Sequence, residues 1–453
     1  MIDDLPELAD PTRPSDSPDV GLAGPTRAIV HLDRIAANLR GIREKVGPDR
    51  GILMAVKADA YGHGAVEVSR YVEREKLADW FGVATVGEGV ELRRAGITSP
   101  IFKLSPALPA EVAPALEARL TLAVASVAEA DAVEAAAADL AAGAGNGGPG
   151  DGRHGCRQGD GRGNEGSRGD GDYRDGRRTH RDRGVGRVAI HVAIDSGMGR
   201  IGLAPGDVEG FAEHVRDRCP HLRVQGAFTH FAVSDSADPE VIAFTEGQLT
   251  VLRQGVAALS ENLGYMVEIV HAANSGGVLG HPGSWGNLVR PGIMTYGYYP
   301  DPSTPRTIEL RPALEWRAPV TFVKRVKAGE TVSYGRTWTA SEDTWVATLP
   351  VGYADGYRRL LSNTGRVLAA GREFVVAGRV CMDQTMIDLG PAGVGGPALQ
   401  VGDEVVLLGE SEQARYTADE MAADLDTIPY EVLTLIGRRV RREYRTSAPT
   451  TRT

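Results

Sequence analysis

The chain of 453 residues has few cysteines, no excess of positive charge and no long hydrophobic run. Its three cysteines, Cys156, Cys219 and Cys381, are too scattered for a disulfide framework, so a reducing compartment suits them. A formal net charge of -10 argues against a nucleic acid or an anionic membrane as the main partner. No apolar stretch is long enough to span a bilayer, and the first residues are acidic where a signal peptide is basic. We therefore expect a soluble, cytoplasmic protein that binds no nucleic acid and no membrane.

Three segments contain few large apolar side chains. Residues 1–25 are rich in Pro, Asp and Ser, residues 143–186 in Gly, Arg and Asp, and residues 447–453 are short and polar. Such segments bury too little surface to offset the entropy of ordering them. We expect a flexible leader, a disordered insertion and a flexible tail. The insertion carries His154, Cys156 and His180, but their spacing is not that of metal ligands, and we expect no metal site.

Outside these segments, short apolar runs alternate with amphipathic ones from residue 26 to residue 305. A helix is expected from Asp33, after a strand at residues 27–32. The strand-like runs that follow lie at residues 51–57, 80–86, 100–104, 120–126, 187–195, 222–231, 267–273 and 289–296. Eight strands separated by helices indicate an α/β barrel of the TIM type, (β/α)8, interrupted by the 143–186 insertion. A doubly wound open sheet is the main alternative.

The pattern changes at about residue 306. Strand-like runs at residues 318–326, 345–349, 374–377 and 404–408 lie between Gly-rich turns, and one late helix is expected at residues 417–425. This spacing predicts a mainly β C-terminal domain over residues 306–446.

Lys57 stands at the end of an apolar run, Ile52 to Val56, and precedes a Gly-rich polar turn. This is the pattern of a buried parallel strand that presents a residue at its carboxyl end. Burial lowers the pKa of a lysine and favours the neutral amine, which can form a Schiff base. The competing interpretation is a lysine whose ammonium group reaches solvent.

Other strand ends carry a second set of polar groups. In a barrel the loops after the seventh and eighth strands commonly bind phosphate through backbone N–H groups and a hydroxyl. Asn274 and Ser275 follow the seventh strand, while Gly292 and Ile293 lie within the eighth apolar run. A buried lysine and a phosphate cradle on one face indicate pyridoxal phosphate. Ordinary turn chemistry remains the alternative for the glycines.

Four segments together resemble the alanine racemases, which are fold type III pyridoxal-phosphate enzymes. They are Ala55-Val-Lys57-Ala-Asp-Ala-Tyr61-Gly-His-Gly64, Asp195-Ser-Gly-Met-Gly-Arg200, Ala273-Asn-Ser275 and Val332-Ser-Tyr334-Gly. The resemblance covers about residues 27–445 apart from the insertion. It implies a pyridoxal-phosphate-dependent isomerase that interconverts L- and D-alanine, with D-alanine serving as a peptidoglycan precursor.

The resemblance assigns Lys57 and Tyr334 as the two catalytic bases. Racemisation needs one base on each face of a planar carbanion, and one group cannot reach both faces. In the family the tyrosine enters the barrel mouth of the other subunit, which implies a homodimer with shared active sites. The alternative for Tyr334 is a half-buried tyrosine of a sheet.

The resemblance also implies cofactor, substrate and entrance residues. Arg290 would donate a hydrogen bond to the pyridine nitrogen and leave it unprotonated, while His230 orients Arg290. The remaining cofactor residues are Tyr61, Arg200, Asn274, Ser275, Gly292, Ile293 and Tyr430. The substrate carboxylate would bind Arg200 and the backbone of Met382. The residues matching the substrate entrance are Asp235, Tyr353, Arg359, Arg379, Ile428 and Tyr430, and Tyr430 narrows it in favour of a methyl side chain.

One position departs from the family. Many members carry a carbamylated lysine two residues before Asp195, where this chain has Ala193. Arg200 therefore needs another anion, such as chloride or a nearby carboxylate. The alternative functions are a broad-specificity amino-acid racemase, a decarboxylase of the same fold type and a non-catalytic pyridoxal-phosphate carrier. A carrier would need Lys57 and the phosphate cradle but neither Tyr334 nor a second domain.

Overall fold

The computed structural model describes residues 24–145, 187–393, 396–411 and 414–446. These residues form two compact units, one containing residues 31–313 and the other residues 314–443 together with the segment before residue 31. The predicted tail, residues 1–23 of the predicted leader and nearly all of the predicted insertion lie outside the described residues; helix α6 continues to Gly145.

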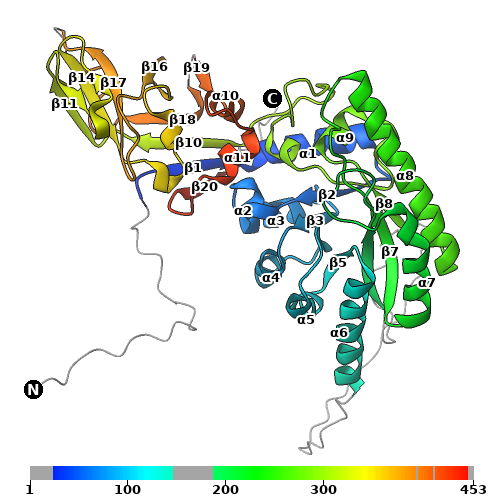
Figure 1. Ribbon diagram of the computed structural model, residues 1–453. Helices are drawn as coiled ribbons and strands as arrows, with labels where there is room; N and C mark the ends of the chain where they lie inside the picture. The colour runs from blue at the N-terminus through cyan, green and yellow to red at the C-terminus, as the bar shows by residue number, and fades with distance from the viewer. Residues whose placement is uncertain (1–23, 146–186, 394–395, 412–413, 447–453) are drawn as a thin grey trace, which may run out of the picture. The chain divides into compact units, whose positions relative to one another are not determined.

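The first unit is built on eight parallel strands in the order β8-β7-β6-β5-β4-β3-β2-β9 (Figure 1). Their bounds are β2 Gly51–Ala55, β3 Trp80–Val83, β4 Ile101–Lys103, β5 Leu120–Val124, β6 Val188–Ala193, β7 Leu222–Phe228, β8 Ile269–His271 and β9 Leu288–Val289. Each strand falls within or beside a predicted run, and the terminal strand β9 pairs back onto β2. The predicted eight-stranded α/β barrel is confirmed, and the open doubly wound sheet is not.

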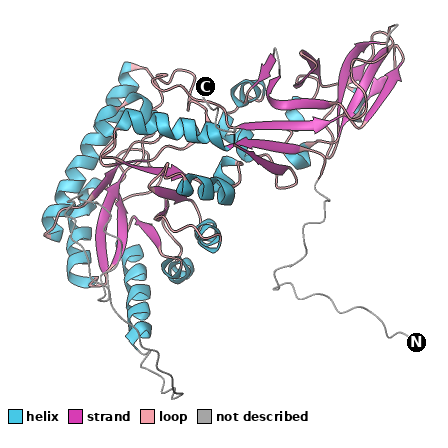
Figure 2. Cartoon of the chain, turned by 180° about the vertical axis from the view of Figure 1, so that it is seen from behind, coloured by secondary structure: helices cyan, strands magenta, loops and turns pink. Residues whose placement is uncertain are grey.

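Helices surround the strands on their outer side (Figure 2). They are α1 Leu32–Val46, α2 Lys57–Tyr61, α3 Ala65–Arg74, α4 Val86–Arg94, α5 Pro109–Glu117, α6 Val127–Gly145, α7 Val208–Arg218, α8 Pro239–Leu263 and α9 Ser275–Gly280. Apolar side chains at helical spacing point inward; in α1, for example, Ile35, Leu39 and Ile42 are fully buried. No helix among the described residues is both long and apolar enough to cross a membrane.

The barrel interior is closed by a cluster of buried side chains. It contains Leu53, Phe102, Ala123, Ala193, Phe228 and Leu288, one from each of six strands. Two histidine rings lie beside it: His271 stacks on Phe228 with ring centroids 5.0 Å apart, and His191 lies 4.9 Å from Phe102. The interior is therefore a packed core, and polar ligands can be held only beyond the strand ends.

The second unit is mainly β, as predicted. Its strands are β1 Arg27–His31, β10 Leu314–Pro319, β11 Phe322–Val326, β12 Thr331–Val332, β13 Trp338–Thr339, β14 Thr344–Leu349, β15 Arg366–Ala369, β16 Arg372–Val375, β17 Thr385–Pro391, β18 Glu404–Ser411, β19 Ala414–Tyr416 and β20 Arg441–Arg445. Two short helices, α10 Ala418–Asp424 and α11 Pro429–Thr434, complete it.

The unit boundaries differ from the predicted domains at the first strand. The predicted barrel domain spans residues 26–305, but β1 pairs antiparallel with β10, from Arg27 opposite Arg317 to Val30 opposite Leu314. It is therefore a strand of the sheet β16-β15-β18-β10-β1-β20. A single strand has apolar residues whether it belongs to the barrel or to the second unit. Its sequence pattern therefore does not predict which strand it pairs with.

Candidate active site

Lys57 lies just beyond the end of β2, separated from Ala55 by Val56, and is followed by a backbone turn in the left-handed conformation. Ala58, Asp59, Ala60 and Tyr61 all have positive φ, between 51° and 54°. Four successive left-handed residues that carry a Cβ are unfavourable, so surrounding contacts must hold them. Backbone bonds supply part of this support, from Ala60 N to Val56 O at 2.8 Å and from Gly62 N to Ala58 O at 3.0 Å.

The environment of the Lys57 amine differs from that of a structural lysine. Burial, reinforced by the charge of Arg200, lowers the pKa of Lys57, while Glu88 opposes the shift. Within the described residues the amine makes no hydrogen bond and no ion pair. Lys103, at the end of β4, donates instead to the carbonyls of Ser105 at 2.9 Å and Pro106 at 2.6 Å. Lys57 thus has a depressed pKa without a structural partner, which suits a reactive amine.

Arg290 follows β9 and is only 5% exposed. Its Nη atoms donate to three backbone carbonyls, those of His271 at 2.7 Å, Thr229 at 2.7 Å and Ala272 at 3.0 Å. Burial, and then the charge of Arg200, lowers its pKa to about 9, so the guanidinium stays protonated at neutral pH. Its Nε makes no hydrogen bond within the described part of the chain, which leaves one N–H for a ligand.

Two histidines lie next to Arg290, and the sequence analysis gave a role to only one. His230 Nδ1 lies 3.5 Å from Arg290 Nη2, at the limit of a hydrogen bond. His271 Nδ1 lies 3.0 Å from Nη1, and its other ring nitrogen lies 2.9 Å from Nδ1 of His191. Burial lowers the pKa of His191 and of His230 to about 3 and that of His271 well below its usual value, so these rings are neutral. His271 therefore supports Arg290 at a shorter distance than His230 does. The sequence could have indicated this residue by its position at the end of a predicted strand, β8.

The predicted cradle after β8 and β9 is assembled around one hydroxyl. Ser275 Oγ accepts a hydrogen bond from Gly292 N at 3.0 Å and lies 3.4 Å from Met294 N. A Cβ on Gly292 would lie 2.7 Å from the hydroxyl oxygen of Tyr61, so this glycine permits a close approach. Asn274 caps helix α9 by accepting from Gly277 N at 3.0 Å. Ile293 is fully buried below the cradle.

Arg200 lies in the exposed turn after β6. Asp195 stabilises that turn, since its carboxylate accepts from Gly197 N at 3.0 Å and Gly199 N at 3.1 Å. Ala193 is 1% exposed within the apolar barrel core, where it offers no charge. No carboxylate pairs with Arg200 in the described segments. The departure at Ala193 therefore leaves Arg200 available for an anionic ligand.

The remaining predicted site residues, apart from the half-buried Asp235 of the barrel unit, belong to the second unit. Tyr334 begins a turn after β12 and is 71% exposed. The turn is fixed by Ser333, whose Oγ donates to the carbonyl of Arg379 at 2.6 Å. Met382 is 53% exposed, and its carbonyl accepts from Ala354 N at 3.0 Å. Tyr334 is thus an exposed side chain on a fixed turn, not a half-buried sheet residue.

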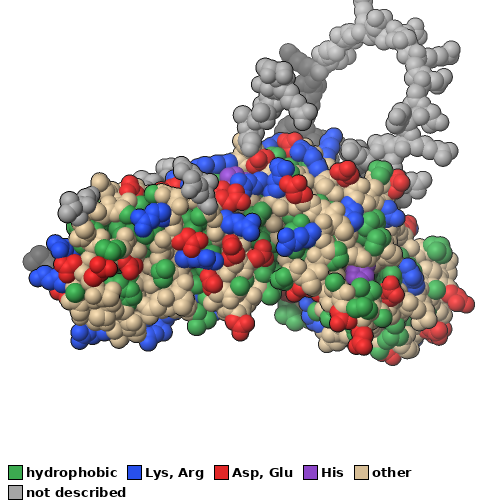
Figure 3. Space-filling model, turned by 90° about the horizontal axis from the view of Figure 1, so that it is seen from above, with side chains coloured by type: hydrophobic (Ala, Val, Ile, Leu, Met, Phe, Trp, Pro, Cys, Tyr) green, Lys and Arg blue, Asp and Glu red, His purple; other side chains and the backbone are tan. Residues whose placement is uncertain are grey.

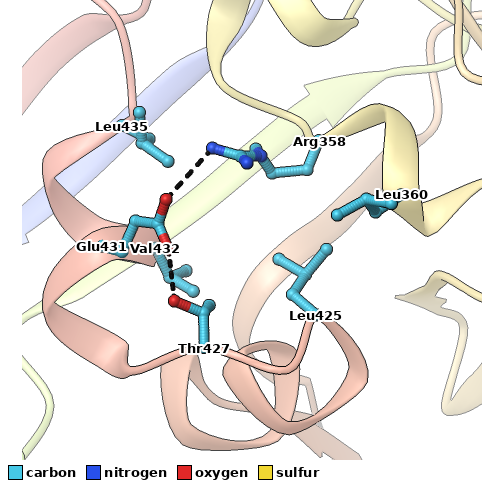
Figure 4. Close-up of a pocket in the computed structure, with 7 residues that line it drawn as sticks. All are labelled: Arg358, Leu360, Leu425, Thr427, Glu431, Val432 and Leu435. Carbon is cyan, nitrogen blue, oxygen red and sulfur yellow. Dashed lines mark hydrogen bonds and ion pairs between the residues drawn. The ribbon is translucent and has the colours of Figure 1, made fainter.

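Three of the predicted entrance residues, Arg359, Ile428 and Tyr430, adjoin in sequence the residues that line a small hollow in the surface of the second unit. Tyr353, Arg359 and Ile428 are exposed, whereas Arg379 and Tyr430 are half-buried. Figure 4 shows the hollow, in which Glu431 accepts from Arg358 at 3.3 Å and also from Thr427. Its residues are Arg358, Leu360, Leu425, Thr427, Glu431, Val432 and Leu435. These contacts fix the segment that carries Ile428 and Tyr430.

Among the residues that the structure describes, one group of metal-ligand types occurs in helices α6 and α7 and at the end of α7. Asp131, His214 and Cys219 place ligand atoms within 4.8 Å of one another. His214 Nε2 already pairs with Asp131 at 2.6 Å, and burial raises the pKa of Cys219 to about 11, which disfavours the thiolate a metal needs. The group is explained as a hydrogen-bonded His214–Asp131 pair beside a buried thiol.

Both units match known protein families along nearly their whole length. The family model described as "Alanine racemase, N-terminal domain" matches residues 30–146 and 178–300. The model described as "Alanine racemase, C-terminal domain" matches residues 313–444. The two matches meet close to the division between the structural units.

Individual relatives extend this likeness to whole proteins. The alanine racemase of Cutibacterium acnes is 45% identical over 421 residues, covering 92% of this chain and 97% of the relative. The alanine racemase of Treponema denticola is 35% identical over 421 residues, which again cover 92% of this chain and 97% of the relative. Among solved structures, the alanine racemase of Clostridium difficile 630 superimposes with a TM-score of 0.77 at 34% identity, covering 94% of this chain and 96% of the other. By both domains and over its full described length, the chain belongs to the alanine racemase family.

Proposed function

We propose that the protein is a pyridoxal-phosphate-dependent racemase that interconverts L- and D-alanine. The observation that carries this proposal is the group of cations at the strand ends of the barrel. The charge of Arg200 lowers the pKa of Lys57 and of Arg290, and all three cations lower the pKa of His230. These groups therefore lie close together. Such a group of positive charges suits an anionic cofactor and the carboxylate of an amino acid. The relative from Bacillus anthracis, 30% identical, was solved with bound L-Ala-P, and one from Clostridium difficile in complex with cycloserine.

The residues present fit pyridoxal phosphate. The Lys57 amine has a lowered pKa and no partner within the described residues, as covalent attachment to an aldehyde requires. The Ser275 hydroxyl and the space above Gly292, which a Cβ would fill, provide a phosphate cradle with Tyr61 beside it. The free Nε of Arg290 supplies the donor for a ring nitrogen. When bound, the cofactor withdraws electrons from the α-carbon and so acidifies its proton.

The two sides of the α-carbon need separate proton carriers. Lys57 would hold or release a proton on one face, since burial lowers the pKa of its amine and so favours the neutral form that can accept a proton. Tyr334 serves the opposite face through its hydroxyl. Arg290 acts by staying protonated: held by three carbonyls and His271, it can donate but not accept. If Arg290 holds the cofactor's ring nitrogen, it would donate to that nitrogen and not protonate it, which would limit side reactions.

The substrate carboxylate has two candidate binding groups. Arg200 has no anionic partner among the described residues and can pair with it. The backbone N–H of Met382 makes no hydrogen bond within the same residues and is a second donor. Tyr430 lies half-buried in the predicted entrance segment, where its ring favours a methyl side chain over a longer one.

We infer that two copies of the chain share each active site. In the second unit, large hydrophobic side chains are exposed at Tyr334, Tyr353, Leu360, Met382, Ile428 and Leu435. Exposed apolar groups of this number indicate a partner surface, and a second copy would bury them. Four of them, Tyr334, Tyr353, Met382 and Ile428, are predicted site residues. Each copy then contributes its tyrosine to the barrel of the other.

The charge and the cysteine content of the chain bear on its expected partners and compartment. Figure 3 shows Lys and Arg side chains intermingled with Asp and Glu on the visible face, not gathered into a basic patch. With a net charge of -10, this favours a small amino-acid substrate over a nucleic acid. A cytoplasmic location agrees with the scarcity of cysteine.

The function is tested by replacing Tyr334 with Phe, which removes only the hydroxyl. We expect Tyr334→Phe to bind the cofactor normally but to slow α-hydrogen exchange from one enantiomer of alanine by 10²-fold or more. The measurement is loss of the α-hydrogen from L- and D-alanine in deuterium oxide, with chirality followed in parallel. Wild-type racemisation by this variant would refute the two-base assignment.

Sharing of sites is tested by mixing two inactive variants. Lys57→Ala and Tyr334→Phe are each impaired, but a mixed dimer has one barrel with Lys57 that receives an intact Tyr334. Random reassortment should restore about a quarter of the wild-type sites. Recovery of activity would support the shared dimer, while no recovery from demonstrated mixed dimers would exclude it.

A further inference from the structure

Glu88 contacts the turn that carries Lys57, although it belongs to a different strand–helix unit. It is the third residue of helix α4, Val86–Arg94, which follows β3. One carboxylate oxygen, Oε1, accepts a hydrogen bond from Ala58 N at 2.7 Å. The other oxygen, Oε2, accepts from Ala84 N at 2.8 Å and Thr85 N at 3.1 Å.

The second of these oxygens performs an ordinary structural task. Thr85 and Glu88 form a capping box. Thr85 Oγ1 accepts from Glu88 N at 3.2 Å, and Glu88 Oε2 accepts from Thr85 N. Helix α6 begins in the same way, with Ser126 accepting from Glu129 N at 3.3 Å and Glu129 accepting from Ala125 N at 2.6 Å. The bond to Ala58 is what distinguishes Glu88 from this equivalent residue.

The turn that Glu88 contacts needs external support. Its residues Ala58 to Tyr61 hold φ values that L residues with a Cβ rarely adopt. Asp59, the second residue of the turn, accepts through Oδ1 from Ala65 N at 2.7 Å and ties the turn to helix α3. At its near end, directly after Lys57, the side-chain contact is that of Glu88. The carboxylate therefore anchors the backbone at the residue next to the reactive amine.

We propose that Glu88 is a positioning residue for Lys57, which keeps the left-handed turn formed by binding Ala58 N while it caps helix α4. This inference rests on the proposed function for its catalytic consequence. Glutamine cannot replace the carboxylate, because both of its oxygens accept hydrogen bonds and glutamine has only one acceptor atom. A glutamine that keeps the capping box would turn its NH2 group toward the Ala58 N–H.

The test compares Glu88→Gln with Glu129→Gln, its matched control in the capping box of α6. Backbone hydrogen exchange is followed by mass spectrometry in a peptide covering residues 55–64 of the full-length protein, and kcat is measured on the loaded enzyme. We expect Glu88→Gln to accelerate exchange in this peptide and to lower kcat, each by about tenfold, the effect of losing one hydrogen bond to a charged acceptor. Glu129→Gln should change neither quantity.

A second variant separates backbone positioning from a simple loss of charge. Glycine adopts positive φ without steric cost, so Ala58→Gly should relieve part of the strain that Glu88 offsets. The double variant Glu88→Gln with Ala58→Gly should recover part of the lost kcat. Wild-type exchange in Glu88→Gln, or a loss of kcat that Ala58→Gly does not improve, would overturn the inference. Exchange does not depend on catalysis, so an inactive wild-type protein would refute the racemase assignment alone.

Discussion

Gly292→Ala should weaken cofactor binding without disturbing the barrel. The added Cβ would lie 2.7 Å from the Tyr61 hydroxyl oxygen, closer than real Cβ contacts allow. Tyr61 cannot easily move away, because it is 7% exposed and its ring packs 5.0 Å from that of Tyr296. Overpacking of this kind costs about 1–3 kcal/mol. If the cost falls on the cradle, the dissociation constant for pyridoxal phosphate should rise about 5- to 150-fold.

The assay is titration of the cofactor-free protein with pyridoxal phosphate, followed by visible absorbance. Gly280→Ala is the matched control, because its Cβ would meet only Pro305 at 3.6 and 3.7 Å, an ordinary contact. Both variants should keep the thermal unfolding profile of the wild type to within a few degrees. Wild-type affinity in Gly292→Ala would show that the space between Gly292 and Tyr61 is not part of the cofactor site.

Three further predictions concern the buried groups. Lowering the pH from 7 to 5 should destabilise the barrel, because His191 and His230 have pKa values of about 3 when folded and bind protons more readily once unfolded. Each contributes about 2 kcal/mol over this interval, so His191→Gln should lose less thermal stability on acidification than the wild type; an equal loss would contradict it. Arg290→Leu leaves three buried carbonyls without their donor and should cost about 1–3 kcal/mol for each one that finds no water; an unchanged Tm would refute this. Phe102→Ala should cost about 3–5 kcal/mol, whereas Leu108→Ala, at a side chain 69% exposed, should be nearly neutral in the same thermal scan.

Much of the fold was predictable from local patterns. The eight barrel strands are apolar runs because both of their faces are covered, and that requirement is visible in the sequence. The lysine at the end of β2 and the polar loops after β8 and β9 were predictable for a related reason. In a parallel barrel the carboxyl ends of the strands meet at one face, so strand-end residues are neighbours. The departure at Ala193 was equally visible, and the structure places this residue in the apolar cluster of the barrel.

Other features depend on contacts between residues far apart in the chain. Strand β1 pairs with β10 across more than 280 residues, which its own five residues cannot specify. The support of Arg290 by His271, and the reach of Glu88 to Ala58, depend on distances and angles between neighbouring strands. The four positive φ angles after Lys57 occur at residues other than glycine, so composition gave no signal for them.

The sequence by itself determined the barrel, the β-rich second unit and the place of Lys57 at the end of a buried strand, because burial and strand ends leave periodic traces in it. Only the tertiary structure decided which groups support that lysine and that arginine, because a hydrogen bond depends on positions in space that packing alone sets.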